Sequence, residues 1–307
     1  MSHQQTFELL ILGSSSASPT SSRYPSGQLL TIADRYFLID CGEAIQMQLR
    51  KYKARFQSIG HLFISHLHGD HFFGVPGLLS SMHLLGRQKE LIIYAPPALK
   101  EIVELMLKTG DTRLKFPIVW RFTNPKKTEL LFEDDKVEVV SFPLKHRIAC
   151  TGFLFKEKKF PRKIDKTKLA SLGISFADIL NLKAGKDVIN SDGKVIKNYD
   201  ATLDPPEPRS YAYCSDTAYF PEIIEVIKGS NLLYHESTFL ESEAKRAAST
   251  FHSTAKQAAE IAKEANVKQL LLGHFSARYK ELGQFEIEAQ EIFANCLLAE
   301  EGKIIKI

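Results

Sequence analysis

The feature that most constrains this chain is a run of four potential metal ligands within six residues. The sequence Ser-His-Leu-His-Gly-Asp-His at residues 65–71 directly follows a short apolar stretch. Imidazole nitrogens suit zinc, and a carboxylate can also be shared between two ions. A regular helix or strand would not aim all four side chains at one point, so we expect a tight turn in which Gly69 supplies the flexibility. The run predicts a metal site formed by His66, His68, Asp70 and His71.

Three more candidate ligands lie far along the chain. One turn cannot complete two zinc coordination shells, because each zinc takes about four ligands and a catalytic zinc keeps a position for water. His146, Asp216 and His274 each follow an apolar stretch that is typical of a strand, at residues 137–142, 211–214 and 267–272. Loops at strand ends are where α/β proteins usually gather their sites. The three residues are therefore candidate donors to the same site.

Composition narrows the class of protein. The 307 residues are 44% hydrophobic and 25% charged, as in an ordinary globular protein, and the net charge of +4 permits an anionic partner without requiring one. The four cysteines are far apart, so neither a disulfide framework nor a cysteine zinc site is expected. No signal peptide is recognised, and no apolar stretch reaches the roughly 20 residues of a membrane span. We expect a cytoplasmic protein without a membrane partner.

One segment, at about residues 155–208, differs from the rest. Its residues 156–168 contain seven Lys and Arg but only two acidic residues, a net charge of +5. Within the segment the pattern predicts a short helix over 175–183 and a hairpin over 188–196, and three prolines at 205, 206 and 208 close it. Such a segment is either a solvated charged excursion or an arm that holds a polyanion.

Several further stretches share motifs with one known family. Together with the histidine-rich run, they resemble the ribonuclease Z family, in its short form, which belongs to the metallo-β-lactamase superfamily. Ser215, Ser237 and Lys186 stand where family members often carry Gly, Ala and Pro, respectively. The motifs are Ser16–Arg23 (SASPTSSR), Phe37–Glu43 (FLIDCGE), Gly69–Leu79 (GDHFFGVPGLL), Ser215–Thr217 (SDT), His235–Thr238 (HEST), His252–Thr254 (HST) and Gly273–Tyr279 (GHFSARY).

The resemblance implies a fold and a set of roles. The fold would be a metallo-β-lactamase αββα sandwich, one nuclease domain over residues 1–307 with a basic arm inserted at about 155–208. Two Zn²⁺ per subunit would be bound, although manganese or iron also accept such ligands. Asp70 would act as general base, and His252, oriented by Glu236, as general acid. The implied ligands are His66, His68 and His146 for one ion and Asp70, His71 and His274 for the other, with Asp216 bridging them.

The resemblance also implies the substrate and the assembly. The family removes the 3′ trailer from precursor tRNA and leaves a 3′-hydroxyl on the tRNA. The arm would clamp the folded tRNA away from the cleavage point, since folded RNA is recognised largely by shape and backbone. A homodimer is implied as well. The alternatives are a small-molecule phosphodiesterase of the same superfamily and a non-catalytic RNA-binding protein that keeps zinc for structure.

Overall fold

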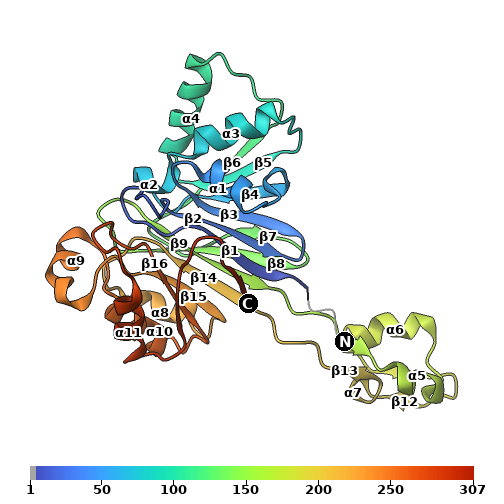
Figure 1. The fold of residues 1–307 in the computed structure, drawn as a ribbon. Coiled ribbons are helices and arrows are strands. Elements are labelled where there is room, and N and C mark those ends of the chain that lie inside the picture. Colours follow the sequence, from blue (N-terminus) through green and yellow to red (C-terminus); the bar gives the residue numbers. More distant parts are fainter. Residues whose placement is uncertain (1–4) are drawn as a thin grey trace. The chain divides into compact units, whose positions relative to one another are not determined.

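The structure, a computed structural model, describes residues 5–307 and divides them into two compact units (Figure 1). The larger unit comprises Gln5–Lys156 and Arg209–Ile307, and the smaller one comprises Glu157–Pro208. Residues 1–4 of the predicted nuclease domain lie outside the described residues. Among the residues described, no helix is both long and apolar enough to span a bilayer.

The larger unit contains two seven-stranded mixed sheets. The first has the strand order β18-β1-β2-β3-β4-β5-β6 and the second the order β17-β16-β15-β14-β9-β8-β7. Strands β3 to β6 run parallel to one another, and so do β14 to β17. The first sheet comprises β1 (Phe7–Gly13), β2 (Gly27–Ile32), β3 (Arg35–Cys41), β4 (Ile59–Phe63), β5 (Leu91–Ala95), β6 (Ile118–Phe122) and β18 (Ile304–Lys306). The second comprises β7 (Glu129–Glu133), β8 (Val137–Pro143), β9 (Thr151–Glu157), β14 (Ser210–Cys214), β15 (Leu232–Glu236), β16 (Leu270–Gly273) and β17 (Cys296–Leu298).

Helices cover the outer faces of both sheets, which confirms the predicted layer order (Figure 1). Aromatic side chains fill the space between the sheets, among them Phe37, Phe63 and Tyr213. The first sheet is covered by α1 (Ile45–Lys51), α3 (Val75–Leu84) and α4 (Ala98–Thr109), and α2 (Gly69–Phe72) contacts β3. The second is covered by α8 (Ile224–Ile227), α10 (Ala255–Glu264) and α11 (Gly283–Gln290), and α9 (Ala244–Thr250) precedes α10.

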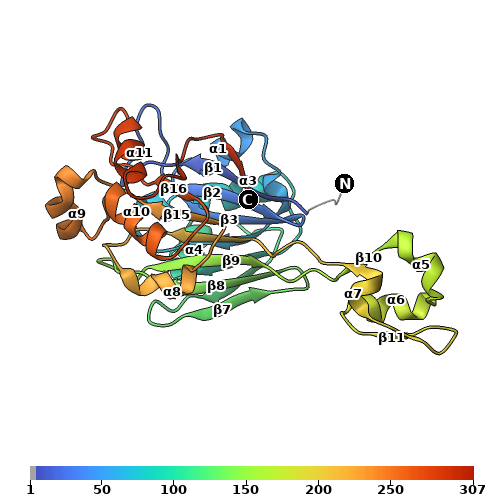
Figure 2. The ribbon, with the colours of Figure 1, turned by 90° about the horizontal axis from the view of Figure 1, so that it is seen from below.

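The smaller unit has an apolar cluster of its own, formed by Leu182, Val188, Ile196 and Ala201. The predicted helix is confirmed as α6 (Phe176–Lys183), capped by Ser175, and the predicted hairpin as β11 (Val188–Ile189) paired with β12 (Val195–Ile196). Figure 2 shows these elements beside the other helices of the unit. The remaining elements are β10 (Lys163–Ile164), α5 (Lys166–Leu172), α7 (Asn198–Ala201) and β13 (Thr202–Leu203).

The smaller unit is less basic than its first residues suggest. Residues 157–208 contain ten Lys and Arg against eight Asp and Glu, a net charge of +2. Some of these charges are paired within the unit, as in the Arg162–Asp204 and Lys197–Asp187 ion pairs. Any affinity of this unit for a polyanion therefore depends on where its cations lie and not on a large overall charge.

Candidate metal centre

The histidine-rich run follows β4 and ends in a helix, not in a tight turn. The loop at residues 64–68 carries His66 and His68, while Asp70 and His71 lie on the first turn of α2. The expectation that Gly69 supplies turn flexibility is wrong, because Gly69 begins this helix and its φ is not positive. The change from loop to helix aims the two halves of the run at two adjacent points.

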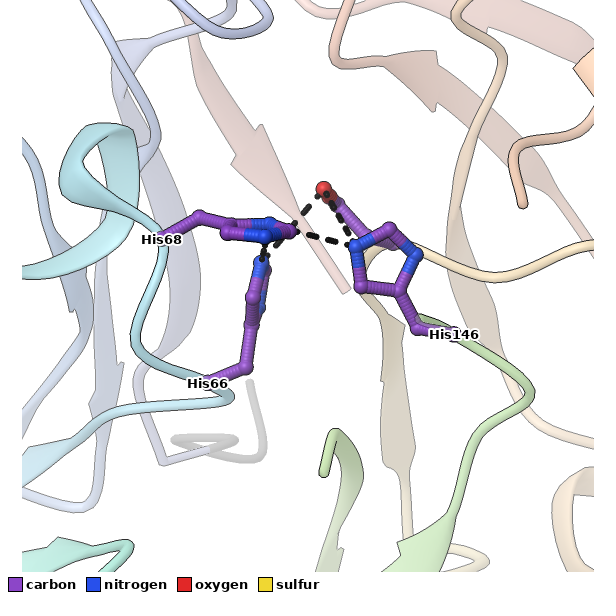
Figure 3. A group of neighbouring side chains, drawn as sticks. His66, His68 and His146 are labelled. Atoms are coloured by element: carbon purple, nitrogen blue, oxygen red, sulfur yellow. Dashed lines mark hydrogen bonds and ion pairs between the residues drawn. The ribbon is translucent and has the colours of Figure 1, made fainter. Parts of the chain in front are cut away.

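The first point collects three imidazoles from two segments of the chain. His68 Nδ1 lies 3.0 Å from His66 Nε2 and 3.2 Å from His146 Nε2. Figure 3 shows these three rings pointing at a common centre. Asp216 places Oδ2 3.5 Å from His66 Nε2 and 3.8 Å from His146 Nε2. Three nitrogens and one carboxylate oxygen thus face one position.

The second point collects Asp70, His71 and His274. Asp70 Oδ2 lies 3.3 Å from the Nε2 atoms of both His71 and His274. The other oxygen of Asp216, Oδ1, lies 3.3 Å from His71 Nε2 and 3.1 Å from His274 Nε2. The Asp216 carboxylate therefore stands between the two groups with one oxygen toward each, and all seven predicted ligand residues are brought together.

This arrangement fits metal cations. Within each group the candidate ligand atoms lie within 4.8 Å of one another. Asp216 Oδ1 is buried and accepts no hydrogen bond among the described residues, as expected of an oxygen that faces an ion. Burial lowers the pKa of His66 to about 4, which keeps its imidazole neutral and able to bind metal. Burial also lowers the pKa of His71, but the charges of Asp70, Asp216 and Asp40 outweigh it and raise that pKa well above its ordinary value.

Asp40 supports the centre from behind. Its Oδ2 accepts hydrogen bonds from His71 Nδ1 at 2.7 Å, Ser65 Oγ at 2.9 Å and Tyr213 Oη at 2.6 Å. Ser65 Oγ in turn lies 3.0 Å from His66 Nδ1. Asp40 thus orients one imidazole of each group, directly or through Ser65, as carboxylates behind metal ligands commonly do.

Glu236 and His252 form a hydrogen-bonded pair beside the metal groups. His252 Nδ1 donates to Glu236 Oε1 at 2.8 Å, and Thr238 Oγ1 donates to Glu236 Oε2 at 2.8 Å. Burial lowers the pKa of His252, but the charge of Glu236 outweighs it and raises the pKa to about 9. His252 is therefore protonated at neutral pH. Thr238 Oγ1 also lies 2.9 Å from His274 Nδ1, a link to the metal groups that sequence reasoning did not identify.

A pocket of about 410 Å³ opens onto these groups. Arg147 and the hydroxyl-bearing Ser249 and Thr250 line it, and sequence reasoning missed all three. Arg278 does not line it; its guanidinium lies 3.4 Å from Glu243 and over the Phe239 ring. The remaining lining residues are Ser16, Ala17, His68, Gly69, Asp70, His146, Asp216, His252 and His274.

Relatives of nearly the same length align with almost the whole of this chain. The ribonuclease Z of Bacteroides fragilis (strain YCH46) is 44% identical over 303 residues, which cover 99% of this chain and all of the relative. The ribonuclease Z of Cytophaga hutchinsonii is 49% identical over 297 residues, 96% of this chain and 95% of the relative. The chain belongs to the ribonuclease Z family. Endonucleolytic tRNA 3′ processing is accordingly its activity, and the match favours this over both alternatives.

Solved structures and family models agree with the fold of this ribonuclease Z family member. Human tRNase Z, short form, superposes with a TM-score of 0.70 at 25% identity, covering 97% of this chain and 98% of that one. The metallo-β-lactamase fold protein YhfI from Bacillus subtilis has a TM-score of 0.69 at 18% identity, covering 99% and 100%, and supports the fold alone. A model described as anti-Pycsar protein Apyc1 matches residues 7–169, and one described as a beta-lactamase superfamily domain matches residues 193–275. The predicted metallo-β-lactamase fold is confirmed.

Proposed function

We propose that this chain removes the 3′ trailer of precursor tRNA by hydrolysis at a centre of two Zn²⁺ per subunit, leaving a 3′-hydroxyl on the tRNA. The observation that carries the proposal is the position of Asp216, whose two oxygens face two separate groups of ligand atoms. A carboxylate placed in this way is suited to bridging two ions. The Glu236–His252 pair beside it supplies a protonated imidazole.

The hydrogen bonds of the imidazoles suggest how each would bind. His66, His68 and His146 would hold the first zinc through Nε2, Nδ1 and Nε2, respectively, because these atoms face one another. Asp70 Oδ2, His71 Nε2 and His274 Nε2 would hold the second. Asp216 would bridge the two ions. Behind the ligands, His71 donates its other ring N–H to Asp40, and His274 donates its own to Thr238 Oγ1.

In the reaction, a water oxygen forms a bond to the scissile phosphorus and the bond from phosphorus to the 3′-oxygen breaks. Bound metal ions supply neutralisation of the phosphate charge and a lowered pKa for the nucleophilic water. Asp70 Oδ2 is engaged by His71, His274 and the Ala17 N–H, so Oδ1 remains to accept the proton of that water. His252 donates a proton to the departing 3′-oxygen, and Glu236 holds its ring in place.

The unit at Glu157–Pro208 would hold the tRNA away from the centre. It contains a pocket of about 540 Å³, lined among others by Lys159, Arg162, Lys183 and Gly185. Cations at such a hollow suit contacts to RNA phosphates, which add affinity but carry little sequence information. The role of the arm and the homodimer are carried over from the family resemblance. A cytoplasmic site of action is inferred from the widely spaced cysteines and from the lack of a recognised signal peptide.

The test uses purified protein, a 3′-extended precursor tRNA and the Asp70→Ala variant. We expect the wild type to make one endonucleolytic cut at the 3′ end of the tRNA body, and chelator or Asp70→Ala to reduce the rate by at least about 100-fold. Metal content is measured in parallel, and two zinc ions per wild-type subunit are expected. If the zinc-loaded wild type hydrolyses bis(p-nitrophenyl) phosphate but leaves precursor tRNA intact, the proposal is wrong.

A further inference from the structure

Arg147 lies at the mouth of the pocket and has no role in the reaction described so far. It directly follows His146 in the loop between β8 and β9, its side chain is exposed, and it lines the pocket. Among the lining residues within the described part of the chain, it is the single Lys or Arg. A site that must admit an RNA backbone past Asp70 and Asp216 thus has one permanently charged side-chain cation, exposed at its entrance.

The hydrogen bond that Arg147 makes is anomalous for this site. Its Nη2 lies 3.2 Å from His68 Nε2, and no carboxylate in residues 5–307 pairs with it. A guanidinium can only donate, so His68 Nε2 accepts here and the ring proton is on Nδ1. Nδ1 is, however, the atom that faces His66 and His146. The ring in this arrangement points a proton at the place where an ion would be bound.

The other four histidines of the two ligand groups each have a hydrogen-bond acceptor, not a donor, beside the ring nitrogen that faces away from the metal position. Each turns its outer ring nitrogen to an oxygen that can accept its proton: Ser65 Oγ for His66, Asp40 for His71, the Phe251 carbonyl for His146 and Thr238 Oγ1 for His274. Such acceptors keep the inner nitrogen free for metal. When His68 binds metal through Nδ1, its proton is on Nε2, and Arg147 then faces a second donor. Its hydrogen bond to His68 is lost, and the guanidinium is free.

We infer that Arg147 is a substrate-binding residue that holds an RNA backbone phosphate next to the scissile one. This inference rests on the proposed function. A guanidinium forms two parallel hydrogen bonds with phosphate oxygens and stays charged at every physiological pH. Its partner is a neighbouring phosphate, because the width of the His68 ring separates Nη2 from Nδ1, the atom on the metal side. Arg147 therefore recognises a polynucleotide and contributes nothing to a substrate with one phosphate.

The experiment compares Arg147→Ala and Arg147→Lys with Arg113→Ala, which removes the same charge from an exposed position that does not line the pocket. Cleavage of precursor tRNA is measured over a series of salt concentrations, beside hydrolysis of bis(p-nitrophenyl) phosphate and zinc affinity by chelator competition. For Arg147→Ala we expect KM for precursor tRNA to rise about tenfold and the slope of log(kcat/KM) against log[salt] to become shallower by about one. For Arg147→Lys we expect a KM between those of the wild type and Arg147→Ala, because lysine keeps the positive charge but lacks the two parallel N–H donors of the guanidinium.

The same variants should leave hydrolysis of the model substrate and zinc affinity unchanged. A loss of zinc affinity together with equal losses on both substrates would show that Arg147 only supports His68, and would overturn the inference. Wild-type KM and salt slope in Arg147→Ala would overturn it too. These results leave the proposed function standing. Failure of the wild type to cut precursor tRNA would instead remove the proposed function, and this inference with it.

Discussion

At the scale of single residues, the centre is held in backbone conformations that most side chains avoid. Asp40, His274 and Ala17 have φ values of 53°, 60° and 61°, all in the left-handed region. Each has a polar function there: Asp40 supports two imidazoles, His274 faces both carboxylates, and the Ala17 N–H donates to Asp70 Oδ2 at 2.7 Å. Such strain persists where the surrounding contacts compensate for it, and at these three positions the compensating contacts are those of the site.

The His252–Glu236 pair yields a prediction at this scale. A general acid must carry its proton, so kcat for precursor tRNA should fall as pH rises through about 9, the pKa to which Glu236 raises His252. In Glu236→Gln the carboxylate charge is gone, the pKa of His252 is lower, and this alkaline fall should move to lower pH. At neutral pH the variant should lose about 100-fold in kcat.

The matched comparison is Glu241→Gln, an exposed glutamate whose loss should leave the pH profile of kcat unchanged. An alkaline fall at the same pH in Glu236→Gln and in the wild type would mean that His252 is not the acid.

At the scale of elements, the end of β3 and the segment around α2 support the site by close backbone contact. Gly74 N donates to the Cys41 carbonyl at 2.8 Å, just after α2. A Cβ on Gly74 would lie 2.0 Å from the carbonyl oxygen of Gly42, and one on Gly42 would lie 2.6 Å from that of Asp70. The segment just after β3, the strand that carries Asp40, and the segment around α2, which carries Asp70, thus touch through main chain, which explains Gly42 and Gly74.

Gly74→Ala should therefore destabilise the protein, because the new methyl group would clash with the backbone of Gly42 and neither main-chain segment can move without cost. We expect a loss of about 2 kcal/mol in the free energy of unfolding, measured with denaturant, together with weaker zinc binding. Gly60→Ala in β4 is the control, since a Cβ there would meet nothing within 4 Å, and it should cost less than about 1 kcal/mol. Equal stability of the two variants would contradict the packing argument.

The sequence predicted those elements best whose ends carry strong local signals. The polar break Ala33-Asp34-Arg35 between two apolar stretches predicts a hairpin, and β2 and β3 do turn at Ala33 and Asp34, both of which have positive φ. The strand predicted over 267–272 begins only at Leu270, because α10 runs on to Glu264 and the link between them takes up the intervening residues. Strands β17 and β18 have three residues each, too few for a periodic pattern.

In the candidate site, too, residues marked by a local sequence pattern could be predicted, whereas residues that matter through contacts formed only in the folded chain could not. The seven ligand candidates were identifiable because each is a histidine or aspartate after a strand or in one dense run. Arg147 was not, because its importance depends on which ring nitrogen of His68 faces it, across a separation of 79 residues. Thr238 was missed as an individual residue for the same reason, since it joins Glu236 to His274 only in space.

At the scale of the whole molecule, the unit at Glu157–Pro208 is inserted between two strands that pair with each other. Strands β9 and β14 are antiparallel, and Lys156 lies opposite Ser210 in their register. Among the side chains that the structure describes, none from 157–208 belongs to the apolar clusters of the larger unit, and Leu182, Val188, Ile196 and Ala201 form a cluster of their own. The larger unit therefore contains a complete core of its own.

This arrangement allows a clean deletion. Replacing residues 157–208 by a short glycine-containing linker, with Arg209 kept as the last loop residue, should join β9 to β14 as a hairpin in the same register. We expect the variant to fold, to bind zinc and to hydrolyse bis(p-nitrophenyl) phosphate within about twofold of the wild type, but to lose precursor tRNA cleavage by at least about 100-fold. Cleavage of precursor tRNA at the wild-type rate would show that the unit does not hold the substrate.

The direct pairing of β9 with β14 also affects how such a protein could acquire new substrates in evolution. A segment that leaves and re-enters the fold at facing residues can lengthen, shrink or be exchanged without altering the register of either sheet. Under the proposed function, in which this unit holds the substrate, the hydrolytic centre and the choice of polymer can then change independently, each under its own selection. The same chemistry can be redirected to another folded nucleic acid by rewriting one contiguous stretch of the gene.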